Sequence, residues 1–463
     1  MFLDLDLKQP NSIAVIDDSG QRLTYGELLD FSKEFNSQIG KRTLIFILSE
    51  NKSGALAGYV ASLSNEIVPL VLSSETDKEL LQKLLEVYQP EYIWVPTSTI
   101  NDFSFECVFS KFDFTLLKTR FSTSPLFSDL SLLLPTSGST GSPKLVRHSY
   151  ANVNENAKNV AKLFEISTDD NAITVLPMHY TMGLSVVSSH LYAGATVLLM
   201  KGNLTDRNFW NFIKENKGTS FTGVPYSFEI LSKLRFFRMD LPNLKIITQG
   251  GGKLNADLFK AYAEFAESSG KKFIATYGQT EGTARMAYLP AELALHKIGS
   301  IGKAIPNGNL SIIDVDGNPI SEIDIAGEMV YKGPNVTLGY ALSGNDLEKG
   351  DENNGILRTG DIAKFDVDGC FYIVGRVSRF LKLYGFRISL DELEQMIKAK
   401  FSLDCVCTGD DDKMNIFVTN DIEIQEISKF VVEKTGLFHK AFEVQFIHEI
   451  PRNEYGKVIY KAL

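Results

Sequence analysis

Short apolar runs alternate with helix-like segments over roughly the first 300 residues, and this alternation constrains the fold most strongly. Residues 75–88 (ETDKELLQKLLEVY) have the composition of an amphipathic helix. The apolar runs read as strands, and they lie at 43–48, 66–72, 172–176, 195–200, 244–249 and 272–277. Strands that alternate with helices are typical of α/β sheets. The sequence therefore predicts an α/β fold with a large N-terminal domain of layered sheets.

The pattern changes between about residues 299 and 375, where short β-like runs are separated by turn sequences such as DVDGNP (314–319). We expect a β subdomain there. Further along, SLDELEQMIKAK (389–400) has the pattern of a capped helix. We place a boundary near Val377–Ser378, which predicts an N-terminal domain over 1–377 and a small α/β domain over 378–463.

Composition excludes several classes of protein. The 463 residues contain 47 Lys and Arg against 57 Asp and Glu, and a net charge of −10 argues against a generic nucleic-acid binder. Four cysteines are too few for a disulfide scaffold. Cys405 and Cys407 have no second Cys or His pair at metal-binding spacing, so they are expected to be buried thiols. The sequence shows neither a signal peptide nor an apolar run of about 18 residues. We therefore expect no membrane insertion and a cytoplasmic location.

The most informative motif is a loop rich in glycine and hydroxyl side chains that follows the apolar run at 132–135. It comprises Thr136, Ser137, Gly138, Ser139, Thr140, Gly141, Ser142, Pro143 and Lys144. Two glycines allow backbone amides to converge on an anion, and the hydroxyls and Lys144 add donors and charge. The spacing differs from a Walker P-loop, which places four residues between its glycines and a glycine before the lysine. The loop therefore indicates a polyphosphate site of another kind.

Three further segments carry candidate chemistry. In ATYGQTEGT (275–283), Tyr277 offers a flat face to a base, and Glu281 offers a carboxylate to Mg²⁺. In LRTGD (357–361), Asp361 can accept ribose hydroxyls, and Arg376 can approach the same sugar or a phosphate. Lys457 follows Gly456 in a C-terminal loop. Taken singly, each segment is also compatible with an ordinary polar turn or a solvated lysine.

Together, and in this order, the four motifs resemble those of the adenylate-forming, AMP-binding superfamily. That superfamily comprises acyl- and aryl-CoA synthetases, adenylation domains of nonribosomal peptide synthetases, and luciferases. Further matching segments are PMHYTMG (177–183), QGGGKLN (249–255), GEMVYKGPNVTLGY (327–340) and GRVSRFLKLYGFRISLDELE (375–394). The resemblance implies a small C-terminal domain that is hinged onto the large one. It also implies activation of a carboxylate by ATP, which gives an acyl-adenylate and pyrophosphate, followed by transfer of the acyl group to a thiol.

The resemblance also assigns roles to single residues. Residues Thr136 to Gly141 and Lys144 would bind the phosphates of ATP, and Thr280 would contact a phosphate. Glu281 would hold Mg²⁺. Tyr277, Gly251, Gly252, Asp361 and Arg376 would bind adenine and ribose. Lys457 would bridge the carboxylate and the α-phosphate, and His179 would border the acyl pocket. Ser378 would be the hinge, and Gly385 would lie beside the acceptor arm.

The acceptor and the acid remain open at this level. The acceptor is either CoA or a phosphopantetheine carrier protein on a separate chain. Relatives that activate amino acids usually carry an aspartate in the segment that here reads PMHYTMG, and this chain has His179 and Tyr180 instead. An α-amino acid is therefore disfavoured as substrate. The alternative from another class is a non-catalytic nucleotide-binding or regulatory protein on the same fold, because a fold alone does not establish chemistry.

Overall fold

The computed structural model describes residues 2–135, 144–383, 386–410, 413–421, 424–453 and 456–463. By its internal contacts the chain divides into two compact units. The first contains residues 1–309 and 331–357, and the second contains 310–330 and 358–463. The boundary predicted near Val377–Ser378 lies inside the second unit, at the short 3₁₀ turn η7 (Val377–Arg379). Its role as a hinge stays a prediction.

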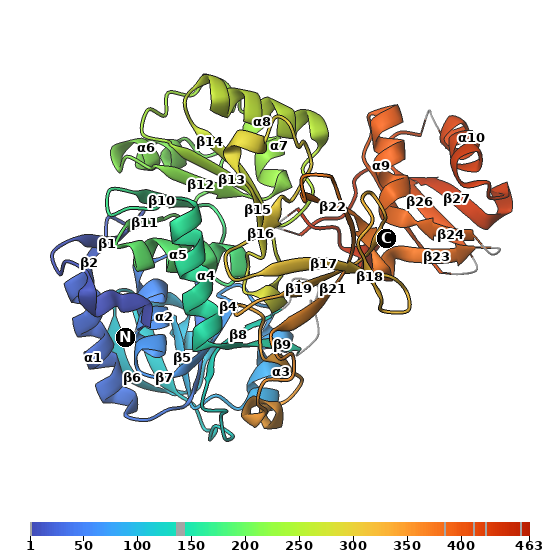
Figure 1. Ribbon diagram of the computed structural model, residues 1–463. Coiled ribbons are helices and arrows are strands. Elements are labelled where there is room, and N and C mark those ends of the chain that lie inside the picture. The colour runs from blue at the N-terminus through green and yellow to red at the C-terminus, as the bar shows by residue number, and fades with distance from the viewer. Residues whose placement is uncertain (1, 136–143, 384–385, 411–412, 422–423, 454–455) are drawn as a thin grey trace. The chain divides into compact units, whose positions relative to one another are not determined.

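The first unit is built on two large sheets (Figure 1). One sheet has nine strands in the order β16-β15-β14-β13-β12-β10-β11-β1-β2, and the other has eight in the order β20-β9-β8-β4-β3-β5-β7-β6. The strands of the first sheet are β1 (Ile13–Asp17), β2 (Arg22–Thr24), β10 (Asn171–Thr174), β11 (Thr196–Leu199), β12 (Ser220–Gly223), β13 (Ile246–Gln249), β14 (Lys272–Tyr277), β15 (Ala287–Leu289) and β16 (Lys303–Ala304). Those of the second are β3 (Leu44–Ser49), β4 (Val68–Ser73), β5 (Tyr92–Pro96), β6 (Glu106–Lys111), β7 (Phe114–Lys118), β8 (Leu130–Pro135), β9 (Leu145–Ser149) and β20 (Gly339–Ala341).

Helices separate the two sheets and bury their inner faces. The helix α2 packs on β1 of one sheet and on β3, β4 and β5 of the other, while α4 packs on β8 and β9 and contacts α5, which packs on β10 and β11. Nearly every residue of α2 and α5 is buried, which explains why both helices are apolar on all sides. The helices of this unit are α1 (Tyr25–Ile39), α2 (Ser53–Ser64), α3 (Lys78–Tyr88), α4 (Tyr150–Leu163), α5 (Thr181–Ala193), α6 (Arg207–Glu215), α7 (Pro225–Lys233) and α8 (Ala256–Ser268).

The second unit contains two parts of the expected β segment, residues 310–330 and 358–375, and the α/β residues after them, whereas residues 331–357 belong to the first unit. Its five-stranded sheet has the order β18-β17-β19-β21-β22, and separate two- and three-stranded sheets follow. Contacts group this sheet with the C-terminal residues. The elements are β17 (Asn309–Ile313), β18 (Pro319–Ile320), β19 (Gly327–Lys332), β21 (Ile356–Phe365), β22 (Phe371–Arg376), β23 (Phe380–Leu383), β24 (Phe386–Ser389), α9 (Leu390–Phe401), β25 (Cys405–Gly409), β26 (Met414–Val418), α10 (Ile424–Thr435) and β27 (Phe442–Phe446).

Two expectations about surface and core can be checked directly. Cys405 and Cys407 are unpaired and fully buried in the core of the second unit, which confirms that they are buried thiols. None of the helices in the described part of the chain is both long and apolar enough to cross a membrane.

Candidate active site

The parallel strands β10, β12, β13 and β14 bring three of the predicted motif segments, and a fourth segment at 224–226, to one edge of the nine-stranded sheet. These four strands are neighbours in the sheet and run parallel, and Gln249 of β13 is paired with Gly223 of β12 and with Ala275 of β14. The carboxyl ends of parallel strands meet at a common edge, where α/β proteins bind ligands. The segments that follow these ends are 175–180, 224–226, 250–252 and 278–283. Residues far apart in sequence thus share one site.

The glycine turn after β13 is in close contact with two of the other segments. Gly251 has a φ of +74°, and a Cβ atom there would lie 2.7 Å from Tyr180 Oη and 3.0 Å from Val224 Cγ1. A Cβ at Gly252 would lie 3.2 Å from Pro225 Cγ. The backbone conformation and the lack of space both require glycine at position 251.

Thr280 and Glu281 lie in η4 (Thr280–Gly282), just beyond β14. Thr280 Oγ1 is 2.9 Å from Thr181 Oγ1 at the start of α5. Tyr340 Oη donates a hydrogen bond of 2.8 Å to Glu281 Oε1, and Lys144 Nζ lies 3.5 Å from the centroid of the Tyr340 ring. Burial and the charge of Glu281 raise the pKa of Tyr340, so its phenol remains a donor at neutral pH. The structure therefore places Lys144 and Glu281 around one tyrosine, with Thr280 next to Glu281 in the chain.

Tyr340 was not among the predicted site residues. It is the last residue of the segment 327–340, which matched the family, but nothing in that segment distinguishes this tyrosine as the partner of Glu281. The same segment also forms hydrogen bonds to the backbone of η4. Asn335 Nδ2 donates to Gly282 O at 2.7 Å, and the amide of Thr337 donates to Glu281 O at 3.0 Å. These bonds fix the position of the Glu281 backbone.

Tyr277 and His179 border the same edge of the sheet. Tyr277 ends β14, and its Oη accepts a hydrogen bond of 3.1 Å from Gln279 Nε2. His179 lies just before α5, where burial lowers its pKa to about 4. The imidazole is therefore neutral at physiological pH. Their predicted roles, adenine stacking and bordering of the acyl pocket, stay predictions.

Asp361 and Arg376 are brought together in the second unit. They face each other on the adjacent antiparallel strands β21 and β22, and Arg376 Nε donates to Asp361 Oδ1 at 3.1 Å. Asp361 is buried, whereas Arg376 is largely exposed. A buried carboxylate beside an exposed guanidinium can present both acceptor and donor groups to a sugar or phosphate.

Lys457 lies in a tight turn of the second unit. Its amide donates to Asn453 Oδ1 at 3.0 Å, and the Asn453 amide donates back to Lys457 O at 2.8 Å. Gly456, with a φ of +72°, permits this turn. Ser378 is in η7. The remaining predicted positions, Thr136, Ser137, Gly138, Ser139, Thr140, Gly141 and Gly385, lie outside the described residues.

Glu281 is the described acid that would hold Mg²⁺. Within the described ranges, no group of three or more His, Cys, Asp or Glu side chains is arranged to bind a metal. A single carboxylate nevertheless fits Mg²⁺ that is shared with a nucleotide, since this ion usually takes only one or two protein carboxylates plus phosphate oxygens. Bound there, Mg²⁺ would neutralise phosphate charge.

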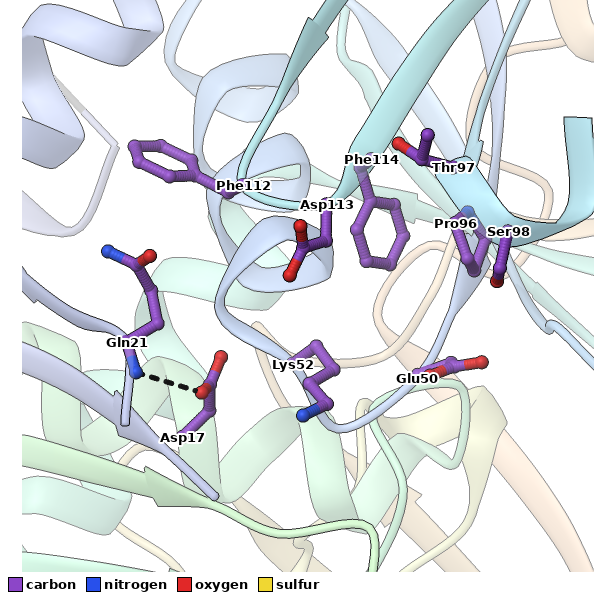
Figure 2. A pocket seen from close by; sticks show the side chains of 10 residues that line it. All are labelled: Asp17, Gln21, Glu50, Lys52, Pro96, Thr97, Ser98, Phe112, Asp113 and Phe114. Atoms are coloured by element: carbon purple, nitrogen blue, oxygen red, sulfur yellow. Dashed lines mark hydrogen bonds between the residues drawn. The ribbon is translucent and has the colours of Figure 1, made fainter. Parts of the chain in front are cut away.

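A separate cavity lies in the first unit (Figure 2). Its walls come from β1, β7 and the start of α2, and they include Asp17, Glu50, Lys52 and Asp113. None of the predicted site residues lines it. Its three carboxylates make it unsuited to a nucleotide phosphate.

Comparison with known proteins gives a consistent result. Luciferin 4-monooxygenase of Luciola mingrelica is 28% identical over 349 residues, which cover 72% of this chain and 63% of that protein. The chain thus spans less than two thirds of that relative. The 2-succinylbenzoate–CoA ligase of Oceanobacillus iheyensis is 25% identical over 473 residues, covering 97% of this chain and 95% of that protein.

Solved structures show the same fold. The O-succinylbenzoate coenzyme A synthetase of Bacillus subtilis in complex with AMP aligns with a TM-score of 0.80 at 21% identity, covering 100% of this chain and 97% of that one. The family model for the AMP-binding enzyme matches residues 6–341, well over half of the sequence. The chain therefore belongs to the family of AMP-binding enzymes.

Proposed function

We propose that the protein is an ATP-dependent carboxylate ligase. It forms an acyl-adenylate and pyrophosphate from a carboxylic acid and ATP, and then transfers the acyl group to a thiol with release of AMP. The observation that carries the proposal is the cluster of Lys144, Thr280, Glu281 and Tyr340 beside the glycine turn of Gly251. Family membership supports it, because this cluster coincides with the motifs that matched the family.

The chemistry requires such a cluster. A carboxylate oxygen must attack the α-phosphate of ATP, and both reactants are anions. Cations and hydrogen-bond donors must therefore hold them together and stabilise the charge on the transferred phosphoryl group. In this proposal Lys144 and Thr280 bind phosphate oxygens, and Glu281 binds Mg²⁺. The contact with Tyr340 orients Glu281 before ATP arrives.

The second unit contributes the other groups. Asp361 accepts the ribose hydroxyls, with Arg376 beside it, and Lys457 bridges the substrate carboxylate and the α-phosphate. Lys457 then withdraws when the C-terminal residues rotate about the hinge at Ser378. We propose residues 378–463 as the moving part. Hinge movements of domains around a bound ligand are a common conformational step in enzymes.

We propose CoA as the thiol acceptor. The relatives support this choice, since CoA ligases are prominent among them and one covers almost the whole chain. A phosphopantetheine arm on a separate carrier protein presents the same thiol. Supplying CoA or a loaded carrier protein to the adenylated enzyme distinguishes the two acceptors.

The test is exchange of labelled pyrophosphate into ATP, which reports the first half-reaction without any thiol. A panel of aliphatic, aryl, hydroxy, amino and dicarboxylic acids is supplied with Mg²⁺, and the Lys457→Ala variant is the control. We expect exchange with one class of acid in the wild type and its loss in the variant. ATP binding without exchange for any acid would instead support the non-catalytic alternative.

A further inference from the structure

Arg285 is a buried arginine whose backbone carbonyl accepts hydrogen bonds from two asparagine side chains. Only 2% of it is exposed, and it lies just before β15. Its carbonyl oxygen accepts hydrogen bonds from Asn156 Nδ2 at 2.9 Å and from Asn335 Nδ2 at 3.1 Å. The first of these partners is on α4, and the second belongs to the segment that supports Glu281. The position of Arg285 is therefore fixed by the same framework as the candidate active site.

One nitrogen of its guanidinium completes a closed ring of hydrogen bonds. Arg285 Nη1 donates to Ser185 Oγ at 2.8 Å, and Ser185 Oγ donates to Asn156 Oδ1 at 3.1 Å. Asn156 Nδ2 closes the ring at the Arg285 carbonyl. This ring orients the side chain without using its other two nitrogens.

Those two nitrogens, Nε and Nη2, are buried and have no hydrogen-bond partner. They form one edge of the planar guanidinium, the edge that binds both oxygens of a carboxylate. Burial lowers the pKa of Arg285 to about 10, so the group remains charged at neutral pH. A buried charge without a counter-ion is costly, and buried charges in proteins are normally paired. No ion pair found among the described residues includes Arg285, whose guanidinium carbon lies 5.3 Å from the centroid of the Phe164 ring.

Arg285 lines a small cavity between α4, α5 and the nine-stranded sheet. The other polar residues of its lining are Ser189, His190, Ser220, Thr222 and Thr248. Burial lowers the pKa of His190 to about 4, so this histidine is neutral and adds no charge of its own. The rest of the lining is apolar and includes Phe164 and Val186, so the cavity combines apolar walls with hydroxyl groups and one cation.

The cavity and the candidate acyl site share strands β12 and β13, because Thr222 and Thr248 of these strands line the cavity. Arg285 interacts electrostatically with Tyr180, whose hydroxyl occupies the space beside Gly251. Tyr180 also packs with Leu176, Met182 and Val224 in a small apolar cluster. An acyl chain that enters from the glycine turn and passes Tyr180 would bring its far end toward Arg285.

We propose that Arg285 binds a second carboxylate of the acid that is activated, so that the substrate is a dicarboxylic acid. The inference rests on the proposed function. The substrate supplies the missing counter-ion, and its two oxygens match the free guanidinium edge. An acid that ends in a methyl group leaves that edge buried and unpaired, and sites built for a polar group reject analogues that lack it. An α-ammonium group would be repelled.

The test compares matched pairs of acids in the pyrophosphate-exchange assay. Aliphatic diacids from malonate to suberate, and 2-succinylbenzoate as an aryl diacid, are each paired with the analogue that lacks the far carboxylate. We expect the wild type to favour one diacid by a factor of about 10² or more in kcat/KM. In Arg285→Met this ratio should fall about 10²-fold, mainly through the KM of the diacid. Arg285→Lys keeps the positive charge but loses the paired donors of the guanidinium, so its ratio of kcat/KM for diacid and monoacid should lie between those of the wild type and Arg285→Met. An equal preference for diacid and monoacid in the wild type would overturn the proposal.

Thermal unfolding gives a second readout that does not depend on turnover. The preferred diacid with AMP should raise the Tm of the wild type and of the exposed control Arg207→Met, but not that of Arg285→Met. Without ligand, the Tm of Arg285→Met should stay within a few degrees of that of the wild type. The substitution removes a buried charge that no acidic side chain pairs, but it also removes the hydrogen bond to Ser185 and the contact with the Phe164 ring. A Tm several degrees lower, with loss of AMP binding, would show a purely structural role and overturn the proposal. If no acid supports exchange but a diacid stabilises the wild type and not Arg285→Met, the proposed function fails, and binding of a dicarboxylate by Arg285 stands without its activation.

Discussion

Glu281 and Tyr340 are 59 positions apart in sequence. Their hydrogen bond brings together two motifs whose contact cannot be inferred from the sequence. The phenol orients the carboxylate, and Lys144 lies over the same ring. A single tyrosine therefore contacts both a cation and an anion of the candidate site.

This contact predicts a graded loss of adenylation. Glu281→Gln should lower kcat for pyrophosphate exchange by about 10²–10³-fold, because it removes the charge that holds Mg²⁺. Tyr340→Phe should lower it by about tenfold, since it removes one hydrogen bond to a charged group. Glu292→Gln, an exposed acid in the same unit, should have no effect. Full activity in Glu281→Gln would remove this residue from the mechanism.

Two buried histidines, His148 and His190, should make the free energy of unfolding depend on pH below about 6.5. Burial lowers the pKa of His148 to about 3 and that of His190 to about 4, whereas both titrate near 6.5 when unfolded. Below pH 6.5 the unfolded chain takes up protons that the folded chain does not, so stability falls as the pH falls. Each histidine should contribute a slope of about 1.4 kcal/mol per pH unit.

Urea unfolding between pH 7 and 5 measures this slope, since most carboxylates titrate below that window. His148→Gln and His190→Gln should each reduce it by about one proton, whatever their effect on stability at pH 7. A wild-type stability that does not change over this range would contradict the assignment.

The sequence predicted some of these residues and missed others, for a physical reason. Thr280, Glu281 and Lys144 are identified by local motifs, and the structure brings them together. Arg285 and Tyr340 were missed, because burial of an arginine or contact with a distant carboxylate depends on tertiary packing that no local pattern encodes.

At the scale of elements, the apolar runs predicted the strands well. The run at 272–277 is β14 without any shift in its ends, and the run at 244–249 begins two residues before β13. Buried parallel strands are continuous apolar runs, and such runs are visible in sequence. The grouping of the five-stranded sheet with the C-terminal residues was not predicted, because it depends on contacts between distant segments.

The glycine turn after β13 predicts a specific steric effect. Gly251→Ala should abolish most pyrophosphate exchange, since its Cβ would lie 2.7 Å from Tyr180 Oη. Gly20→Ala is a matched control, because Gly20 has a similar φ of +88° with nothing within 4 Å of a new Cβ. Both variants carry the backbone strain of about 1–2 kcal/mol, and only the first carries the clash. Equal activities in the two variants would mean that the contact with Tyr180 is unimportant.

Arg379 connects several elements of the second unit. Its Nε lies 2.6 Å from Asp391 Oδ1, and it also pairs with Glu394 and bonds to Tyr460 Oη and Cys407 O. Arg379→Ala leaves two partly buried acids unpaired. The free energy of opening of α9 and β25 should therefore fall by about 3 kcal/mol.

Hydrogen exchange of the amides in α9 and β25 measures that loss. Arg358→Ala breaks an exposed pair with Glu328 in the same unit and should change protection by less than about 1 kcal/mol. Similar protection in both variants would show that the Arg379 network adds little.

At the scale of the whole molecule, the proposed mechanism uses Lys457 in adenylation but not in transfer of the acyl group to the thiol. Lys457→Ala should lower pyrophosphate exchange by about 10²–10³-fold, because it removes the cation between two anions. Transfer from a synthetic acyl-adenylate to CoA should change by less than about tenfold, since Lys457 is withdrawn in that step. Equal losses in both assays would argue against domain alternation.

The path of the chain between the two units has a further consequence. The chain passes from one unit to the other three times, between 309 and 310, between 330 and 331, and between 357 and 358. A protease that cuts at any one of these crossings produces two fragments, of which at least one retains residues of both units. Limited proteolysis should therefore yield nicked enzyme that migrates intact under native conditions. Neither unit can be expressed whole as an uninterrupted stretch of sequence, so isolating either would require a designed linker or a circular permutation.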